Sequence, residues 1–293
     1  MFCDRSGVIL LSWNFLERCI FSQKSSIIYF GVLMRIKFLF KIEKLPIIYR
    51  HRFVALIKES LSKSDEKLKN LYYPEKSVEK TKIAKPFSFA VKLPRNKSIV
   101  KENIEIDDGV TIEEEVFYFP ENSFISFFIT SYDYNFLISL YNAIITLKEF
   151  ELFKGINIHF IKAVLLKEKK IDENKICFRT LSPILIEDKD ENPLLPIENL
   201  ELFNRELNLI EGKIKKDLLG SELKSNLVLT PIQVKKEKVK ITIRNHRKEN
   251  PVLLFTPFSG TFVLEGDSED LNFLYQKGIG LRTGQGFGMV EMV

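Results

Sequence analysis

The pattern of apolar and polar positions changes abruptly at Met34. From Arg35 to Ile42 polar and apolar residues alternate, apart from a slip at Leu39, which predicts a strand with one buried face. Residues 1–33 show no clean periodicity. Their apolar runs fall far short of the roughly 20 residues that cross a bilayer, and they lack the features of a signal peptide. We therefore expect Met34 to be the natural start and residues 1–33 to be a non-native or disordered extension.

Beyond Met34 the chain repeats one order of elements in two halves. In the first half we expect strands and helices at 35–42, 50–62, 86–93, 116–119, 124–130, 133–148 and 156–166, with the third and fourth strands forming a hairpin or following one another. In the second half we expect them at 176–186, 199–219, 227–234, 239–244, 252–264, 267–277 and 286–292. Asp133 and Asp267 are expected helix N-caps, and Gly220 and Gly278 are expected to end helices, Gly278 in the left-handed conformation. This order predicts an α+β fold of two βαββαβ units, at 34–170 and 171–293.

Composition narrows the class of protein. Hydrophobic residues make up 45% of the chain and charged residues 28%, which excludes a collagen-like or mainly disordered chain. The 25 phenylalanines favour a β-rich core. Cys3, Cys19 and Cys177 are too few and too scattered for a disulfide framework or a zinc cluster, which indicates a reducing cytoplasm.

Charge is distributed unevenly, although the formal net charge is only +5. Residues 34–101 carry 18 basic residues against 6 acidic ones, and residues 235–248 carry 7 basic residues and 1 acidic one. Residues 102–121 carry 8 acidic residues and no basic one. This split predicts a polyanion-binding side, with nucleic acid as the first candidate, and a separate acidic side. A solvated, lysine-rich surface is the alternative.

The glycine-rich tail, residues 278–288, is the most specific local signal. Five glycines fall within eleven positions. Glycines let backbone N–H groups converge on a phosphate and let a ligand approach closely, which favours a ligand-binding loop over a tight turn without a ligand. A dinucleotide fingerprint does not fit, because that loop follows a strand and opens a helix, whereas the tail follows a helix and leads into the last strand.

Three motifs resemble the repeat-associated RAMP superfamily, and most closely its CRISPR-associated endoribonucleases that process precursor CRISPR RNA. The motifs are the tail itself, extended to Gly286-Phe-Gly-Met-Val290, the segment Phe178-Arg-Thr-Leu-Ser-Pro-Ile184, and the segment Leu45-Pro-Ile-Ile-Tyr-Arg-His51. The resemblance covers about residues 34–293. It implies tandem ferredoxin-like (RRM-like) domains, in agreement with the element order above.

The resemblance also implies a chemistry. The resembled enzymes use no metal: the ribose 2′-hydroxyl attacks the adjacent phosphate and leaves a 2′,3′-cyclic phosphate and a 5′-hydroxyl. Such a reaction needs a base, an acid and cations around the phosphorane. The chain contains no His-x-x-x-His, Cys-pair or clustered-carboxylate motif, which argues against a metal nuclease, and we expect no cofactor.

His51 is the preferred acid–base candidate. It falls in the first turn of the helix expected at 50–62, opposite the apolar face, so we expect it to be exposed, and the helix N-terminus would keep it neutral. Lys58 shares its side of the helix, and Tyr49 lies just before it. A surface histidine without a role is the alternative.

At one position the chain departs from the resembled enzymes. Many of them carry a histidine just after the first helix, and Tyr73 takes that place here. This change leaves room for a slow or inactive member. Lys85 could neutralise a phosphate or could be an ordinary lysine beside a strand.

The expected RNA contacts fall in two segments. They are Arg244, His246 and Arg247 of the basic run, and Gly280, Arg282, Thr283, Gly284, Gln285 and Gly286 of the tail. Phe87 and Phe89 could stack on bases or fill the core. We expect His159 to be a structural residue of its strand.

Together these features lead to the hypothesis of a cytoplasmic endoribonuclease that cuts precursor CRISPR RNA within its repeats and so produces guide RNAs for antiviral defence. The alternative is a catalytically inactive repeat-RNA-binding subunit of a CRISPR effector complex. Expected partners are CRISPR repeat RNA and effector-complex subunits, with no membrane, and the expected state is a monomer or homodimer.

Overall fold

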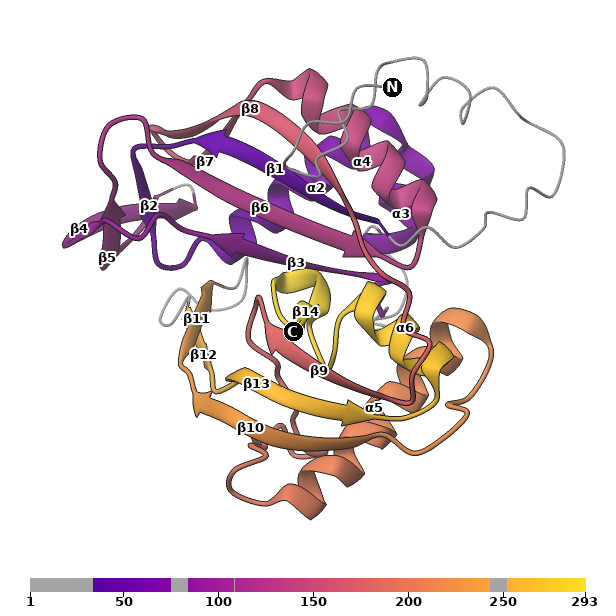
Figure 1. Cartoon of the computed structure of the whole chain (residues 1–293). Helices are drawn as coiled ribbons and strands as arrows, with labels where there is room; N and C mark the ends of the chain where they lie inside the picture. Colours follow the sequence, from indigo (N-terminus) through magenta and orange to yellow (C-terminus); the bar gives the residue numbers. More distant parts are fainter. Residues whose placement is uncertain (1–33, 75–83, 108, 243–251) are drawn as a thin grey trace, which may run out of the picture.

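The computed structural model describes residues 34–74, 84–107, 109–242 and 252–293. Its N-terminal part forms the upper layer of Figure 1 and its C-terminal part the lower layer. The elements are β1 (Met34–Lys41), β2 (Lys44–Pro46), α2 (Arg50–Ser64), α3 (Glu66–Tyr72), β3 (Phe87–Lys92), β4 (Ser98–Asp107), β5 (Val110–Tyr118), β6 (Phe124–Ser131), α4 (Tyr134–Leu147), β7 (Glu149–Phe153), β8 (Ile156–Lys167), β9 (Lys175–Thr180), α5 (Leu200–Leu219), β10 (Val228–Lys236), β11 (Val239–Thr242), β12 (Val252–Phe255), β13 (Phe258–Glu265), α6 (Ser268–Lys277), η1 (Thr283–Gln285) and β14 (Val290–Met292). The expectation for residues 1–33 lies outside the described residues.

The N-terminal part is built on a five-stranded antiparallel sheet in the order β3-β6-β1-β8-β7. The alternation that predicted β1 directs Phe38 toward α2 and α4, where it packs with Phe127 of β6 and Tyr141 of α4. Phe53 of α2 completes this contact with its ring centroid 5.1 Å from that of Phe127. The rings lie on one face of the sheet because successive side chains of a strand point to opposite faces.

The C-terminal part repeats this arrangement with a four-stranded sheet in the order β10-β13-β9-β14. In both sheets the first strand of the unit lies between the third and the fourth, and the second strand lies at the edge. The core of the second unit centres on Phe178, Phe262 and Phe203 under α5 and α6. The predicted tandem ferredoxin-like fold is confirmed.

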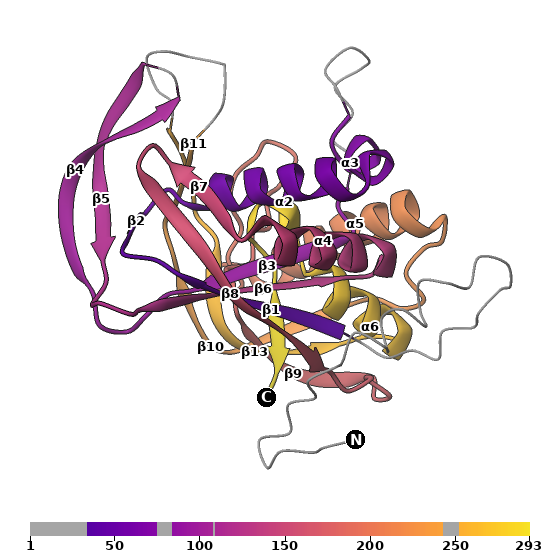
Figure 2. The same ribbon diagram turned by 90° about the horizontal axis from the view of Figure 1, so that it is seen from above.

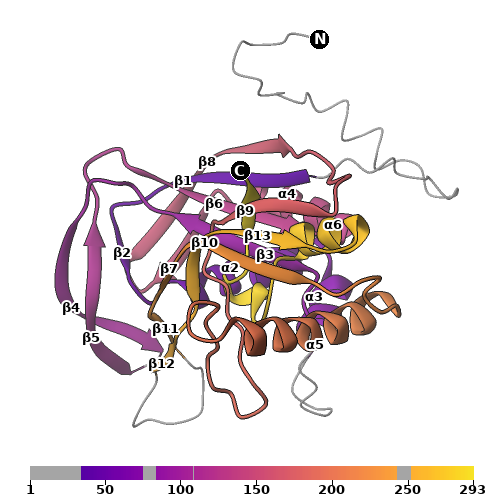
Figure 3. The same ribbon diagram turned by 60° about the horizontal axis from the view of Figure 1, so that its bottom comes forward.

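Each unit carries an inserted hairpin, and neither was predicted correctly. The strand expected at 116–119 is the end of β5, which pairs with β4 and β2 and not with β6. The acidic segment 102–121 therefore lies largely in the hairpin β4–β5. In the C-terminal unit β11 and β12 form a separate two-stranded hairpin. The single strand expected at 252–264 is therefore wrong, because it divides into β12 and β13, which belong to different sheets. Figures 2 and 3 place both hairpins at the same end of the molecule.

The helix ends follow the capping residues with one exception. Asp133 and Asp267 accept hydrogen bonds from the first-turn N–H groups of α4 and α6, and Gly220 ends α5 in the left-handed conformation, as expected. Gly278 ends α6 with φ 90° and ψ 161°, so the expected left-handed cap is wrong there. A Cβ at Gly278 would lie 2.5 Å from the Cβ of Ser88, so close contact with β3 explains the glycine.

The two units are joined by contacts of α6 and the tail with the first sheet. Arg35 of β1 donates a hydrogen bond of 2.7 Å to the carbonyl of Val290 and forms an ion pair of 2.8 Å with Glu168. The ring of Phe273 on α6 lies edge-on to Tyr132, with centroids 5.4 Å apart. Because these contacts come from both units, they hold α6 and the tail against the first sheet.

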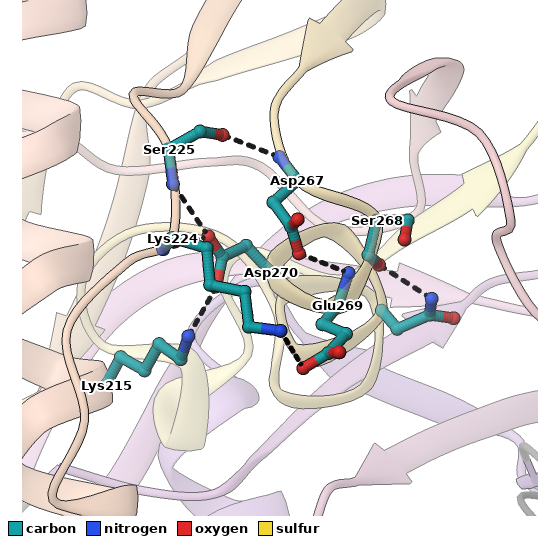
Figure 4. A network of polar contacts seen from close by, with 8 residues as sticks. Lys215, Lys224, Ser225, Asp267, Ser268, Glu269 and Asp270 are labelled. Atoms are coloured by element: carbon teal, nitrogen blue, oxygen red, sulfur yellow. Dashed lines mark hydrogen bonds and ion pairs between the residues drawn. The ribbon is translucent and has the colours of Figure 1, made fainter.

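Buried charges hold α6 in place within its own unit. Figure 4 shows Asp270 of α6 between Lys215 of α5 and the chain at Lys224 and Ser225. Its carboxylate lies 2.5 Å from the Lys215 ammonium and accepts the N–H of Lys224 at 2.7 Å. Asp270 is fully buried, and several hydrogen bonds are what a buried carboxylate requires. The network fixes the helix that leads directly into the glycine-rich tail.

Candidate nucleic-acid interface and active site

A pocket of about 340 Å³ opens between α2, the two inserted hairpins and the glycine-rich tail. It is lined by His51, Arg52, Val54, Ala55 and Lys58 of α2, by Ile106, Ile241, Thr242, Leu253 and Phe255 of the hairpins, and by Arg282 and Gln285 of the tail. Four predicted site residues, His51, Lys58, Arg282 and Gln285, therefore line one pocket. These lining residues include three cationic side chains, one histidine and no carboxylate, which suits a polyanion.

His51 sits at one end of this pocket and is half-buried, more than its wheel position predicted. Its Nδ1 lies 2.7 Å from the carbonyl oxygen of Ile48, and its ring stands edge-on to Phe153 at 5.6 Å. A carbonyl oxygen only accepts hydrogen bonds, so Nδ1 carries the hydrogen. In the neutral imidazole Nε2 is then the nitrogen that can accept a proton.

A second group of polar side chains, Lys58, Tyr73 and Lys85, lies beside the pocket; we call it the lysine–tyrosine cluster. The Nζ atoms of both lysines lie 4.8 Å from the centroid of the Tyr73 ring. Lys85 also donates a hydrogen bond to the carbonyl of Tyr72. Lys58 belongs to the cluster and to the pocket lining, so the pocket opens onto the cluster.

Burial shifts the pKa of two members of the lysine–tyrosine cluster. Desolvation, together with the nearby charge of Lys58, lowers the pKa of Lys85 to about 8. Burial raises the pKa of the Tyr73 hydroxyl, whose oxygen is buried and has no hydrogen-bond partner among the described residues. A lysine whose pKa is strongly lowered by burial and by a neighbouring cation marks a candidate functional site.

The glycine-rich tail is buried between the two units, and the expectation that it lies at the surface is wrong. A Cβ at Gly284 would lie 2.7 Å from Cγ of Lys85, and one at Gly286 would lie 2.8 Å from the ring of Phe89. Gly280 and Thr283 are buried as well. Close approach to Lys85 and β3 explains Gly284 and Gly286, and close approach to the carbonyl of Leu185 explains Gly280. The expected RNA contacts of the tail stay a prediction, and of these residues Arg282 and Gln285 line the pocket.

A buried ion pair supports the start of the tail. Glu211 of α5 and Lys277 of α6 are fully buried, with 2.7 Å between carboxylate and ammonium, and the other carboxylate oxygen accepts the N–H of Gly280 at 2.6 Å. Burial raises the pKa of Glu211 and lowers the pKa of Lys277. The pair fixes the backbone from which Arg282 extends.

Several sequence-predicted residues lie elsewhere. Tyr49 is buried in the first core against Phe53 and does not line the pocket. Phe87 and Phe89 are core residues, so the base-stacking option is wrong for both. His159 is a sheet residue as expected, but it is exposed. Arg244, His246 and Arg247 lie outside the described residues.

The basic run and the acidic segment do not form separate sides. Lys240 of β11 and Glu114 of β5 form an ion pair of 2.5 Å that joins the two inserted hairpins. Glu114 is buried, although its neighbour Glu113 is exposed. The predicted separation of charges is therefore wrong at this point, where the two segments meet beside the pocket.

Sequence reasoning missed the residues whose roles depend on distant partners. Glu114, Glu211 and Lys277 carry no local signal, because charged residues on amphipathic elements are normally exposed. Phe255, which packs under Arg282, is one of many phenylalanines. The run of apolar residues around it offered the only signal that could have found it.

Two further properties concern the described part of the chain. None of its helices is long and apolar enough to cross a membrane. Among the described residues, no three His, Cys, Asp or Glu side chains gather in a way that could hold a metal ion.

The fold and the pocket define a protein of two ferredoxin-like units with a basic pocket between them. Residues 166–292 match the family described as CRISPR associated protein Cas6, C-terminal. This match over the C-terminal part of the chain confirms the resemblance inferred from the tail. A search of curated proteins finds no match to this chain.

Solved structures match over nearly the whole chain. "Characterization of a Cas6-related gene from Pyrococcus furiosus" matches with a TM-score of 0.68 and 19% identity over 90% of this chain and 99% of that chain. "An RAMP protein binding different RNA substrates" matches with a TM-score of 0.67 and 18% identity over 89% of this chain and 99% of that chain. "CRISPR associated protein Cas6" matches with a TM-score of 0.61 and 19% identity over 89% of this chain and 99% of that chain. At these identities the similarity establishes the tandem fold of Cas6 and RAMP proteins.

Proposed function

We propose that this protein is an endoribonuclease that binds CRISPR repeat RNA and cuts it by attack of a ribose 2′-hydroxyl on the adjacent phosphate. The observation that carries the proposal is the basic pocket, where His51, Lys58 and Arg282 come together from segments far apart in the chain. The Cas6 C-terminal domain supports the same assignment, and one solved neighbour is described as an RAMP protein binding different RNA substrates.

The residues present divide the chemistry among them. His51 is the proton-transfer group, because its Nδ1–H donates to Ile48 and its neutral Nε2 accepts the 2′-hydroxyl proton. Lys58 and Lys85 neutralise the phosphate oxygens as the phosphorane forms. The bond between phosphorus and the 5′-oxygen then breaks, and the leaving oxygen takes a proton from water or from the His51 imidazolium formed in the first step. The products are a 2′,3′-cyclic phosphate and a 5′-hydroxyl, and no metal takes part.

A second function, an RNA-binding subunit that does not cut, is favoured by one specific observation. Tyr73 stands where the resembled enzymes carry a histidine, and burial keeps its hydroxyl protonated by raising its pKa. A tyrosine with a raised pKa is a poor base near neutral pH. If His51 takes no part in proton transfer, the lysine–tyrosine cluster would hold RNA without cutting it.

Incubation of the purified full chain with its own repeat RNA in EDTA distinguishes these two functions. We expect a single cut whose 5′ fragment ends in a cyclic phosphate, identified by mass spectrometry before and after acid treatment. Tight binding with intact RNA would favour the non-cleaving subunit. Absence of both binding and cleavage would contradict both functions.

A further inference from the structure

Arg282 adopts a backbone conformation that side chains other than glycine rarely adopt. Its φ is 57° and its ψ is 31°, within a tail where several neighbours are glycines. A left-handed arginine costs stability relative to glycine, and such strain clusters at functional sites. The conformation is retained at a position where its side chain reaches the pocket, so the side chain is the feature to explain.

The guanidinium of Arg282 lies over an aromatic ring and has unused hydrogen-bonding capacity. Its Cζ lies 4.5 Å from the centroid of the Phe255 ring, which in turn packs edge-on against Phe287. The Nε atom of Arg282 is buried and has no hydrogen-bond partner among the described residues. An orphaned, buried donor indicates a ligand that completes it.

The remaining pocket wall suits a flat apolar group. Val54 and Ala55 of α2 and Ile106 and Leu253 of the hairpins supply the apolar lining. Gln285, which is exposed, adds an amide that both donates and accepts hydrogen bonds. A pocket of about 340 Å³ with apolar walls and two convergent polar groups is typical of a small-ligand site.

We propose that this pocket binds one unstacked purine base of the substrate RNA. The base stacks on the Arg282 guanidinium, whose other side rests on Phe255. Gln285 then reads the N7 edge of the base, the side that distinguishes purines from pyrimidines. Arg282 supplies the stacking plane, and its N–H groups, which lie in that plane, bind ribose or phosphate oxygens of the same nucleotide. Proteins that recognise RNA sequence mostly bind unpaired, unstacked bases, and arginine guanidinium planes serve as stacking surfaces for such bases.

The location of the pocket gives the bound base a consequence for cleavage. Lys58 lies at the junction of the pocket and the lysine–tyrosine cluster, so a base in the pocket brings its own phosphate beside two ammonium groups. The pocket therefore selects which phosphate reaches the site. This inference rests on the proposed function for the identity of the RNA, but the preference for a purine can be measured without it.

The first test uses repeat RNAs with one abasic nucleotide at each position near the cut. We expect one position to lose about 5- to 100-fold in affinity, the loss that removal of one stacked base causes. That position should be a purine, and a pyrimidine there should bind no better than the abasic RNA. Gln285→Ala and Arg282→Lys should each lower the affinity for the intact RNA. Each should also reduce the difference in affinity between the intact and the abasic RNA. If abasic sites at all positions reduced the affinity equally, or if the variants lowered the affinity for intact and abasic RNA equally, the proposal would be overturned. Neither result would contradict cleavage of repeat RNA.

The second test keeps the proposal measurable if repeat RNA is not bound. The four nucleoside 5′-monophosphates are titrated into the full chain, and the Arg282 Nε–H and Gln285 amide signals are followed by NMR. GMP and AMP should shift both signals at lower concentration than UMP and CMP, and Gln285→Ala should remove the preference. Equal response to all four nucleotides, or no response, would overturn the purine pocket.

Discussion

Gly286 and Phe89 lie so close together that a Cβ on the glycine would be 2.8 Å from Cε2 of the phenylalanine ring. The first residue belongs to the tail of the C-terminal unit, and the second belongs to the edge strand β3 of the N-terminal unit. The contact explains the glycine at position 286 before any ligand is considered. It also makes the position of Arg282 and Gln285 depend on the packing of the two units.

Replacing Gly286 by alanine should destabilise the protein through two effects. The residue has φ 86°, so any side chain is strained, and its Cβ would press on the Phe89 ring. Gly220 is a matched control, because its φ is 67° and a Cβ there would meet nothing within 4 Å. We expect Gly286→Ala to lower the free energy of unfolding by about 1–3 kcal/mol more than Gly220→Ala does. Equal losses in urea unfolding would contradict the packing role.

Replacing Glu211 by glutamine should leave a buried ammonium without its counter-charge. We expect Glu211→Gln to cost about 3–5 kcal/mol of stability, because the Lys277 charge stays in the core unpaired. The double variant Glu211→Met with Lys277→Met removes both charges and should cost less than the single change. Chemical unfolding of the three proteins measures this, and a double variant as unstable as the single one would show that the pair itself provides the stability.

Glu114 should compete with RNA phosphate for the ammonium of Lys240. Removing the carboxylate frees the ammonium, so Glu114→Gln should raise RNA affinity and steepen its salt dependence by up to about 0.7, the value of one added phosphate contact on a single strand. Glu113→Gln is the matched control, because it removes the same charge from the next residue, which is exposed. The gain should vanish in a Lys240→Gln background. A similar gain from Glu113→Gln would mean that only the net charge matters.

Lys85 should make RNA cleavage fall as pH rises above about 8. Its pKa is lowered to about 8 by burial and by Lys58, so the phosphate-neutralising ammonium is lost above that pH. Lys85→Arg keeps the charge at high pH, and its kcat/KM should stay level where that of the wild type declines. A wild-type rate that rises through pH 8 would mean that neutral Lys85 acts as a base.

The same pKa shift predicts the direction of a change in stability. The unfolded lysine, with a pKa near 10.4, binds its proton up to a higher pH than the folded one. Below about pH 8 the lysine is charged in both states, and burying that charge destabilises the fold. As pH rises from about 8 to about 10 the folded lysine loses its proton before the unfolded one does, so the free energy of unfolding increases. Lys85→Met should remove this increase in urea unfolding measured across the window.

The sequence predicted the elements whose signals are local. Alternation around Phe38 identified β1, and the capping residues Asp133 and Asp267 located the starts of α4 and α6. The hairpin β4–β5 was missed because consecutive glutamates hide the alternation of its strands. Its pairing with β2 joins segments far apart in the chain, which no local pattern contains.

The sequence identified residues of the candidate site but not their arrangement around one pocket. His51, Lys58, Arg282 and Gln285 were identified from helix position and the glycine-rich tail, but nothing in the sequence indicated that they line one pocket. The buried partners of the tail explain the difference. Phe89 and Lys85 lie about 200 residues before the glycines that contact them, so the cause of the glycine pattern becomes apparent only after folding.

The role of His51 in proton transfer is the central claim, and single-turnover cleavage of the repeat RNA at saturating protein tests it most directly. We expect His51→Ala to slow the cleavage step by about 10²–10⁴-fold with little change in RNA affinity, since a neutral imidazole contributes little to phosphate attraction. His159→Ala, an exposed histidine on β8 that does not line the pocket, should cleave at the wild-type rate. Full activity of His51→Ala, together with loss of cleavage in Tyr73→Phe, would contradict the account. The proton-transfer role would then belong to the lysine–tyrosine cluster.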